Sequence, residues 1–275
     1  MNEPISRFLA GTPRLHYLEW NPTAPHTLVL LHGNSANAWW WRPMAEVLSG
    51  ANLRLLALDF RGHGDSEWVR PPGYAPADYA DDLARLIPAA GAAGAIAIGH
   101  SMGGIAVLAF AARHYRLVRA VAAIDVAITS GPRRRHYLRR LRTIPTVSYS
   151  DLATAKARFR LMPNEGAIAP EIIAEIAEHS IQRTIEGAYS MKFDRESFFG
   201  SDGLDVAAAI ASVQVPLLLV RAEHSRIMTA EAASNARCIN PMVELVTIPD
   251  AHHHLPLEAP ESLARVIERF VMAHV

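Results

Sequence analysis

A serine between glycines is the clearest candidate for a residue that does chemistry. The segment Gly99–Gly103 has the pattern G-x-S-x-G, with Ser101 at its centre. It follows the apolar run Ala95–Ile98 and precedes a helical pattern over Ile105–Ala112. A serine on a sharp turn from strand to helix takes strained backbone angles, so only small residues fit beside it and its hydroxyl stands clear of the sheet. Taken alone, the pattern is weak, because such a turn can simply end a strand.

A serine hydroxyl is a good nucleophile at neutral pH only when a base removes its proton, and imidazole suits that task. Three histidines, His252–His254, lie near the C-terminus, which allows the chain order serine, acid, histidine. A third signal is His32-Gly33-Asn34, directly after the apolar run Leu28–Leu31. Signals at three separate places favour nucleophilic catalysis over a structural turn.

Together these segments resemble the α/β-hydrolase superfamily over nearly the whole chain. The resemblance implies an α/β fold, with a mainly parallel sheet flanked by helices and a helical cap insertion, and it implies that Ser101 is a nucleophile. A serine at this place, rather than an aspartate, argues against haloalkane dehalogenase chemistry. The motifs are Leu31-His32-Gly33-Asn34 with Trp39-Trp40-Trp41, Asp59-Phe60-Arg61-Gly62-His63-Gly64-Asp65-Ser66, the turn at Ser101, and His253-His254-Leu255-Pro256-Leu257-Glu258-Ala259-Pro260.

The resemblance also ranks the three adjacent histidines. In the family, the catalytic histidine lies five residues before the Glu of an L-E-x-P segment, which is Glu258 here, so His253 is the expected base. We expect His252 and His254 to orient the loop or to pack. No metal site is expected, because consecutive side chains diverge and no Cys or carboxylate has supporting ligand spacing.

The acid is where the chain departs from the family. An Asp usually follows the strand expected at Leu217–Val220, but the sequence there is R-A-E-H-S-R. Two candidates remain: Asp125, after the strand expected at Val118–Ile124, and Glu223, near the usual place. The role is set by geometry and not by sequence position, so Asp125 is our preferred acid and Glu223 the alternative. A purely structural carboxylate at a strand end is the other interpretation of Asp125.

Negative charge on a substrate oxygen needs donors that are already in place, and one backbone N–H is typically worth about 3 to 4 kcal/mol. The expected oxyanion-hole donors are the backbone N–H groups of Asn34 and Met102. His32 is expected to buttress its loop. Within Trp39–Trp41, we expect core packing and one indole that lines an acyl pocket.

Apolar runs that alternate with helical patterns predict strand–helix–strand units. Helices are expected over Ala77–Ala90 and Ile105–Tyr115, and after Pro260, which suits a first helical turn. The segment Asp59–Gly64 lacks the spacing of a phosphate loop and is interpreted as a structural turn. The expected strands are Leu28–Leu31, Leu53–Leu58, Ala95–Ile98, Val118–Ile124, Leu217–Val220 and Val243–Ile248.

Strand signals stop between Gly131 and Gly200, where the composition becomes amphipathic and rich in Arg. We therefore expect residues 1–130 and 201–275 to form two parts of one core, and residues 131–200 to form a helical cap with its best helix over Pro170–Glu186. Such an insertion can roof a pocket at the carboxyl ends of the strands. The arginines at 133–135, 139, 140 and 142 are interpreted mainly as a solvated helix face, with binding of an acidic substrate, an acyl carrier group or an anionic surface as the minor alternative.

The 275 residues are 50% hydrophobic and 20% charged, the balance of a soluble globular protein. Lys plus Arg and Asp plus Glu each total 27, so a nucleic-acid or anionic-membrane partner is not expected. The single cysteine, Cys238, has no partner for an internal disulfide. With no apolar leader in the sequence, we expect a cytoplasmic protein.

The sequence thus predicts a cofactor-independent serine hydrolase that cleaves a small apolar ester or related acyl compound through an acyl-enzyme on Ser101. Hydrolysis of a carbon–carbon bond, a lactone, a thioester or an amide uses the same groups and stays open. An alternative from another class is a ligand-binding receptor on the same fold, with slow turnover or none.

Overall fold

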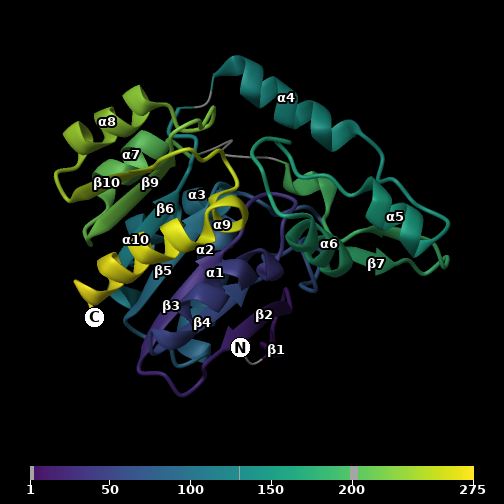
Figure 1. The fold of residues 1–275 in the computed structure, drawn as a ribbon, viewed down its shortest axis with the longest axis horizontal. Helices are drawn as coiled ribbons and strands as arrows, with labels where there is room; N and C mark the ends of the chain where they lie inside the picture. Colours follow the sequence, from purple (N-terminus) through teal and green to yellow (C-terminus); the bar gives the residue numbers. More distant parts are fainter. Residues whose placement is uncertain (1–2, 130, 199–203) are drawn as a thin grey trace.

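An eight-stranded sheet forms the centre of the molecule (Figure 1). The structure is a computed structural model and describes residues 3–129, 131–198 and 204–275. Strands β1 and β2 pair antiparallel, as do β2 and β4, whereas all other neighbours are parallel. In sheet order the strands are β1 (Ile5–Leu9), β2 (Leu15–Trp20), β4 (Leu53–Leu58), β3 (His26–Leu31), β5 (Ala95–His100), β6 (Val118–Ile124), β9 (Leu217–Ala222) and β10 (Val243–Ile248).

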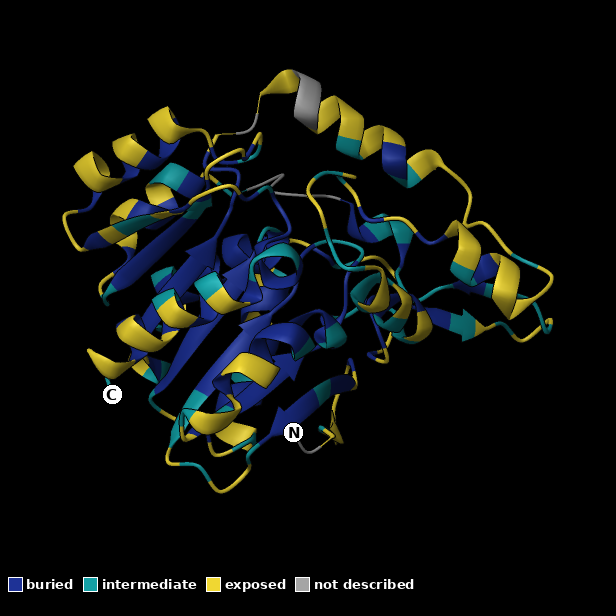
Figure 2. Ribbon diagram, viewed as in Figure 1, coloured by how far each residue is buried: buried dark blue, intermediate teal, exposed yellow. Residues whose placement is uncertain are grey.

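The parallel strands are apolar because helices cover both faces of the sheet (Figure 2). Alternate residues of one strand enter opposite cores: Leu28 and Leu30 join one, and Val29 and Leu31 join the other. One face carries α2 (Pro76–Ala89), α3 (Met102–His114), α7 (Val206–Ser212) and α8 (Ala230–Ile239), and the other carries α1 (Arg42–Val47) and α10 (Pro260–Met272).

The expected α/β architecture is therefore confirmed, with every expected strand present. The sequence analysis missed β1 and β2 at the antiparallel edge. Strand β1 is largely exposed, so it lacks the continuous apolar character of the central strands.

Between β6 and α7, the chain forms α4 (Pro132–Thr143), α5 (Leu152–Arg158) and α6 (Pro170–His179), followed by the short hairpin β7 (Ile181–Arg183) and β8 (Tyr189–Met191). We call residues 131–198 the inserted segment. In Figure 1 it lies along the upper right of the view, away from α10. The domain boundaries expected near 130 and 200 fall at residues outside the described part, so they remain predictions.

The helix predicted over Pro170–Glu186 extends too far at its C-terminal end. It ends at His179, and Ile181 begins a strand that pairs with β8. The turn of the hairpin is closed by the Thr184 amide, which donates to the Ala188 carbonyl at 2.7 Å, and Gly187 takes a positive φ of 85° there. Strand pairing thus satisfies backbone groups that a longer helix would have used.

Two other expectations concern polar segments. In α4, Arg135, Arg139 and Arg140 are exposed, whereas Arg142 donates to Glu196; the side chains of Arg133 and Arg134 lie outside the described part. The segment Asp59–Gly64 is a structural turn, since buried Asp59 accepts hydrogen bonds from His16 and from the amides of Ala38 and Asp65.

Among the described residues, no helix combines the length and apolar character needed to cross a membrane.

Candidate active site

Ser101 lies on a strained turn between β5, which ends at His100, and α3, which begins at Met102. Its backbone has φ 54° and ψ −115°, a conformation that residues with a side chain rarely adopt. Neighbouring glycines make the turn possible: a Cβ at Gly99 would overlap the carbonyl oxygen of Gly103, and one at Gly103 would overlap that of Leu31. The sequence therefore holds the serine where β5, β3 and α3 meet.

His253 brings an imidazole to this serine from the far end of the chain. The Ser101 hydroxyl lies 3.1 Å from Nε2 of His253, a distance at which it can donate a hydrogen bond. On the other side of the ring, Nδ1 donates to Oδ2 of Asp125 at 2.7 Å. The structure thus joins serine, imidazole and carboxylate in one hydrogen-bonded chain.

Asp125 follows β6 directly and is fully buried, with a positive φ of 47° that turns the chain. Its carboxylate also accepts from the Ser225 hydroxyl at 2.6 Å and from the Ala222 amide at 3.2 Å. Burial raises the pKa of Asp125 to about 6, while these two donors act in the opposite direction by stabilising the charged form. Asp125 therefore connects the histidine to the end of β9.

Glu223, the alternative acid, is exposed. Its Oε2 accepts the amide of Asp250 at 3.0 Å, so it supports the turn after β10. The structure brings Asp125, and not Glu223, to the ring of His253.

The two histidines beside His253 differ in their burial and in their contacts. His252 is partly exposed and lies 3.6 Å from the Glu258 carboxylate. His254 is buried, donates from Nε2 to the Pro163 carbonyl at 2.7 Å, and packs edge-on against Trp40. His254 therefore ties the histidine loop to the inserted segment.

Asn34 and Met102 line the same cavity as Ser101. Met102 is the first residue of α3, so its backbone N–H has no acceptor within that helix, and the positive end of the helix dipole lies at the serine. The loop before Asn34 is held by buried His32, which donates from Nδ1 to the Gly33 carbonyl at 2.7 Å and accepts the Phe60 amide at Nε2. The backbone group of Met102 is thus placed by α3, and that of Asn34 by a loop that His32 holds through two hydrogen bonds.

The cavity has a volume of about 440 Å³ and is mainly apolar. Trp40 lines it, whereas Trp41 lies in the core and Trp39 stacks on His179, so one of the three indoles faces the cavity as expected. Asn34, Arg160 and Asn164 are among its polar residues. The inserted segment supplies Tyr137, Leu138, Leu141, Leu161, Met162 and Phe198.

Sequence reasoning missed two residues of this site. Ser225 contacts Asp125 across 100 positions of sequence, and His100 donates to the His253 carbonyl across 153 positions. The only sequence signal for His100 is its place beside Ser101. Nothing in the sequence marks Ser225.

Comparison with known proteins agrees with the fold described above. The chain is 29% identical over 247 residues to 2-(acetamidomethylene)succinate hydrolase of Mesorhizobium japonicum, covering 90% of this chain and 88% of that relative. The crystal structure of an E-2-(acetamidomethylene)succinate hydrolase superposes with a TM-score of 0.82 and 29% identity, covering 98% of this chain and 99% of the other. An esterase of Mycobacterium tuberculosis is 24% identical over 228 residues, covering 82% of this chain and 74% of that protein. Residues 28–266 match a family model described as the alpha/beta hydrolase family, and the chain belongs to that family.

Proposed function

We propose that the protein is a serine hydrolase that cleaves a carboxylic ester or a related acyl compound through an acyl-enzyme on Ser101. The single observation that carries the proposal is the hydrogen-bonded chain of Ser101, His253 and Asp125 at the wall of an apolar cavity. In this proposal His253 is the base, and Asp125 holds its ring and stabilises the imidazolium.

The first half of the reaction forms the acyl-enzyme. Oγ of Ser101 attacks the substrate carbonyl carbon while its proton moves to Nε2 of His253, and the imidazolium then gives that proton to the leaving alcohol as the carbon–oxygen bond breaks. Asp125 stays ionised and accepts from Nδ1 throughout. In the second half, water attacks the acyl carbon and gives its proton to Nε2, after which the acid leaves and the proton returns to Ser101.

The backbone N–H groups of Asn34 and Met102 are the proposed donors to the oxyanion. They suit this role because they line the cavity at Ser101 and one begins a helix of 13 residues. Removal of one such donor typically costs about 3 to 4 kcal/mol in the transition state.

The cavity indicates the class of substrate. Its lining of Trp40, Ile105, Leu141 and Phe198 suits an apolar acyl chain, and about 440 Å³ holds a small molecule. The inserted segment closes one side of this cavity, and we propose that it acts as a cap.

Amide hydrolysis is the second candidate. It is favoured by the relative that shares 29% identity over 90% of this chain, because that enzyme's name includes an acetamido group. Amides and esters use the same nucleophile and oxyanion donors and differ in the leaving group that needs the proton.

The test uses p-nitrophenyl esters of graded chain length, with p-nitroacetanilide as an amide that carries the same acyl group as the acetate ester. We expect many turnovers per site with wild type and none above background with Ser101→Ala. Labelling by a fluorophosphonate should map to the peptide that contains Ser101. A single turnover that ends in a stable adduct would support the receptor alternative, and labelling confined to another serine would exclude the proposal.

A further inference from the structure

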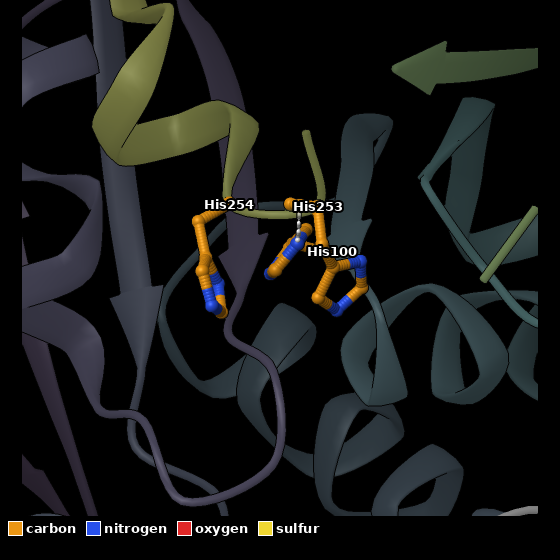
Figure 3. A group of neighbouring side chains, drawn as sticks. All are labelled: His100, His253 and His254. Carbon is orange, nitrogen blue, oxygen red and sulfur yellow. Dashed lines mark hydrogen bonds between the residues drawn. The ribbon is translucent and has the colours of Figure 1, made fainter. Parts of the chain in front are cut away.

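Two more histidines line the cavity beside His253. The ring centroids of His100 and His253 lie 4.7 Å apart, and those of His253 and His254 lie 5.2 Å apart. Figure 3 shows the three side chains side by side below the loop that carries His253 and His254. One ring nitrogen of each histidine lies within 4.8 Å of one from each of the others.

Two of these rings keep an unused lone pair. Nε2 of His100 donates to the His253 carbonyl at 2.7 Å, and Nε2 of His254 donates to the Pro163 carbonyl at 2.7 Å. Nδ1 of each ring is therefore unprotonated. Among the described residues neither Nδ1 has a hydrogen-bond partner, although only 2% of each residue is exposed. Buried polar atoms are normally satisfied, so two unpaired acceptors in one cavity indicate a ligand.

The hydrogen bonds of the three imidazoles match those of metal-binding histidines. Such a histidine usually donates its second ring N–H to a carboxylate or a backbone carbonyl. His253 does so to Asp125, and His100 and His254 do so to backbone carbonyls.

We propose that His100, His253 and His254 form a binding site for a first-row transition metal ion such as Zn²⁺. Three imidazoles with an exchangeable fourth ligand, water or the Ser101 hydroxyl, satisfy the tetrahedral preference of Zn²⁺. Zn–N bonds are about 2.0 to 2.1 Å long, so binding draws the three nitrogens closer together than in the free protein. His252, whose ring lies at Glu258, takes no part.

The ion is an inhibitor rather than a cofactor. It occupies Nε2 of His253, the atom that must accept the Ser101 proton, so hydrolysis stops while it is bound. This inhibition rests on the proposed function, whereas the binding itself does not.

Calorimetric titration of wild-type protein with ZnCl₂, without substrate, tests the site. We expect one Zn²⁺ per chain, and a Kd at least about tenfold weaker in His100→Gln and in His254→Gln. Two matched controls remove exposed ligands elsewhere: His224→Gln, beside Glu223 and Asp250, and Cys238→Ser. Both controls should bind Zn²⁺ like wild type.

Three results would overturn the proposed metal site. They are equal affinity for Zn²⁺ in wild type and in both cavity variants, loss of Zn²⁺ binding in a control variant, and no Zn²⁺ binding by wild type. If neither cavity variant folds, Co²⁺ added to wild-type protein decides: a tetrahedral visible spectrum supports the site, and the spectrum of hydrated Co²⁺ rejects it. Zn²⁺ should also slow fluorophosphonate labelling of Ser101. If the protein binds Zn²⁺ but the metal-free protein has no hydrolytic activity, the proposed function is rejected and the metal site is retained.

Discussion

The hydroxyl of Ser225 donates at 2.6 Å to Oδ2 of Asp125, the same oxygen that accepts Nδ1 of His253. Ser225 Oγ in turn accepts the backbone amides of Ile227 and Met228, both at 3.0 Å. One side chain thus joins the buried carboxylate to the loop before α8. Because this hydroxyl stabilises the charged form of Asp125, its removal has a defined effect on the pH dependence.

Ser225→Ala is expected to raise the pKa of Asp125 above its wild-type value of about 6, since a donor to the carboxylate is lost. A hydrogen bond to a charged group is worth about 1.5 to 3 kcal/mol, so the acidic limb of the pH profile of kcat should move up by roughly one pH unit or more. The check is ester hydrolysis between pH 5 and 9. An unchanged limb with a uniformly lower rate would mean that Ser225 acts only on folding.

Asp125→Asn should lower kcat by about 10⁴-fold at pH 7, because an amide cannot stabilise the imidazolium and favours the wrong tautomer of His253. The matched control is Glu223→Gln, which removes an exposed carboxylate bound to the Asp250 amide. It should stay within about twofold of wild type, since it does not contact the histidine. Loss of turnover in folded Glu223→Gln alone would reverse the assignment of the acid.

The same carboxylate affects stability with a definite sign. Its pKa is raised on folding, so the native state binds the extra proton between the unfolded value near 3.9 and about 6. This group's contribution to the free energy of unfolding is therefore largest below about pH 4 and is lost as pH rises through 6. Across that window, the free energy of unfolding of wild type, measured relative to that of Asp125→Asn, should fall by up to about 3 kcal/mol. Urea unfolding of both proteins at pH 4.5 and 7.5 measures this difference. A difference that grows with pH would contradict the assigned direction.

Backbone strain at Ser101, the proposed nucleophile, predicts a gain in stability when activity is lost. Ser101→Gly relieves the positive φ of 54° and should raise the free energy of unfolding by about 1 kcal/mol relative to Ser101→Ala, which keeps the Cβ. Both variants should be inactive. Thermal unfolding of the pair measures the difference, and equal midpoints would show that the turn stores no strain.

The crowded glycines of the turn give a second stability test. Gly103→Ala places a methyl group against the carbonyl oxygens of Leu31 and His32, which are backbone atoms that cannot yield easily. We expect a loss of about 3 kcal/mol. Gly131→Ala is the control, because a Cβ there meets nothing within 4 Å and should change stability little. Similar losses for both would indicate a general helix effect rather than crowding at the turn.

The sequence predicts well what depends on neighbouring residues. Runs such as Val118–Ile124 are apolar at nearly every position because both faces are covered, so their strands can be recognised locally. Ser101 and its glycines form one local turn, and the resemblance to the family singles out His253 by its spacing to Glu258. What the sequence leaves open depends on contacts across the fold.

Asp125 and Glu223 illustrate that limit. Both follow strands whose carboxyl ends lie at the same edge, and only the folded chain shows which carboxylate lies on Nδ1 of His253. Within the histidine triplet only His253 and His254 lie together, with ring centroids 5.2 Å apart, whereas His252 lies at Glu258. The third ring of the proposed site is His100, which comes from β5.

The hydrogen bond between Ser101 and His253 spans 152 positions of sequence, and the loop that carries His253 follows β10, which pairs with β9. During synthesis on the ribosome, Ser101 therefore emerges long before His253. Recovery of hydrolysis after refolding should therefore report that β10 has paired with β9 at the edge of the sheet.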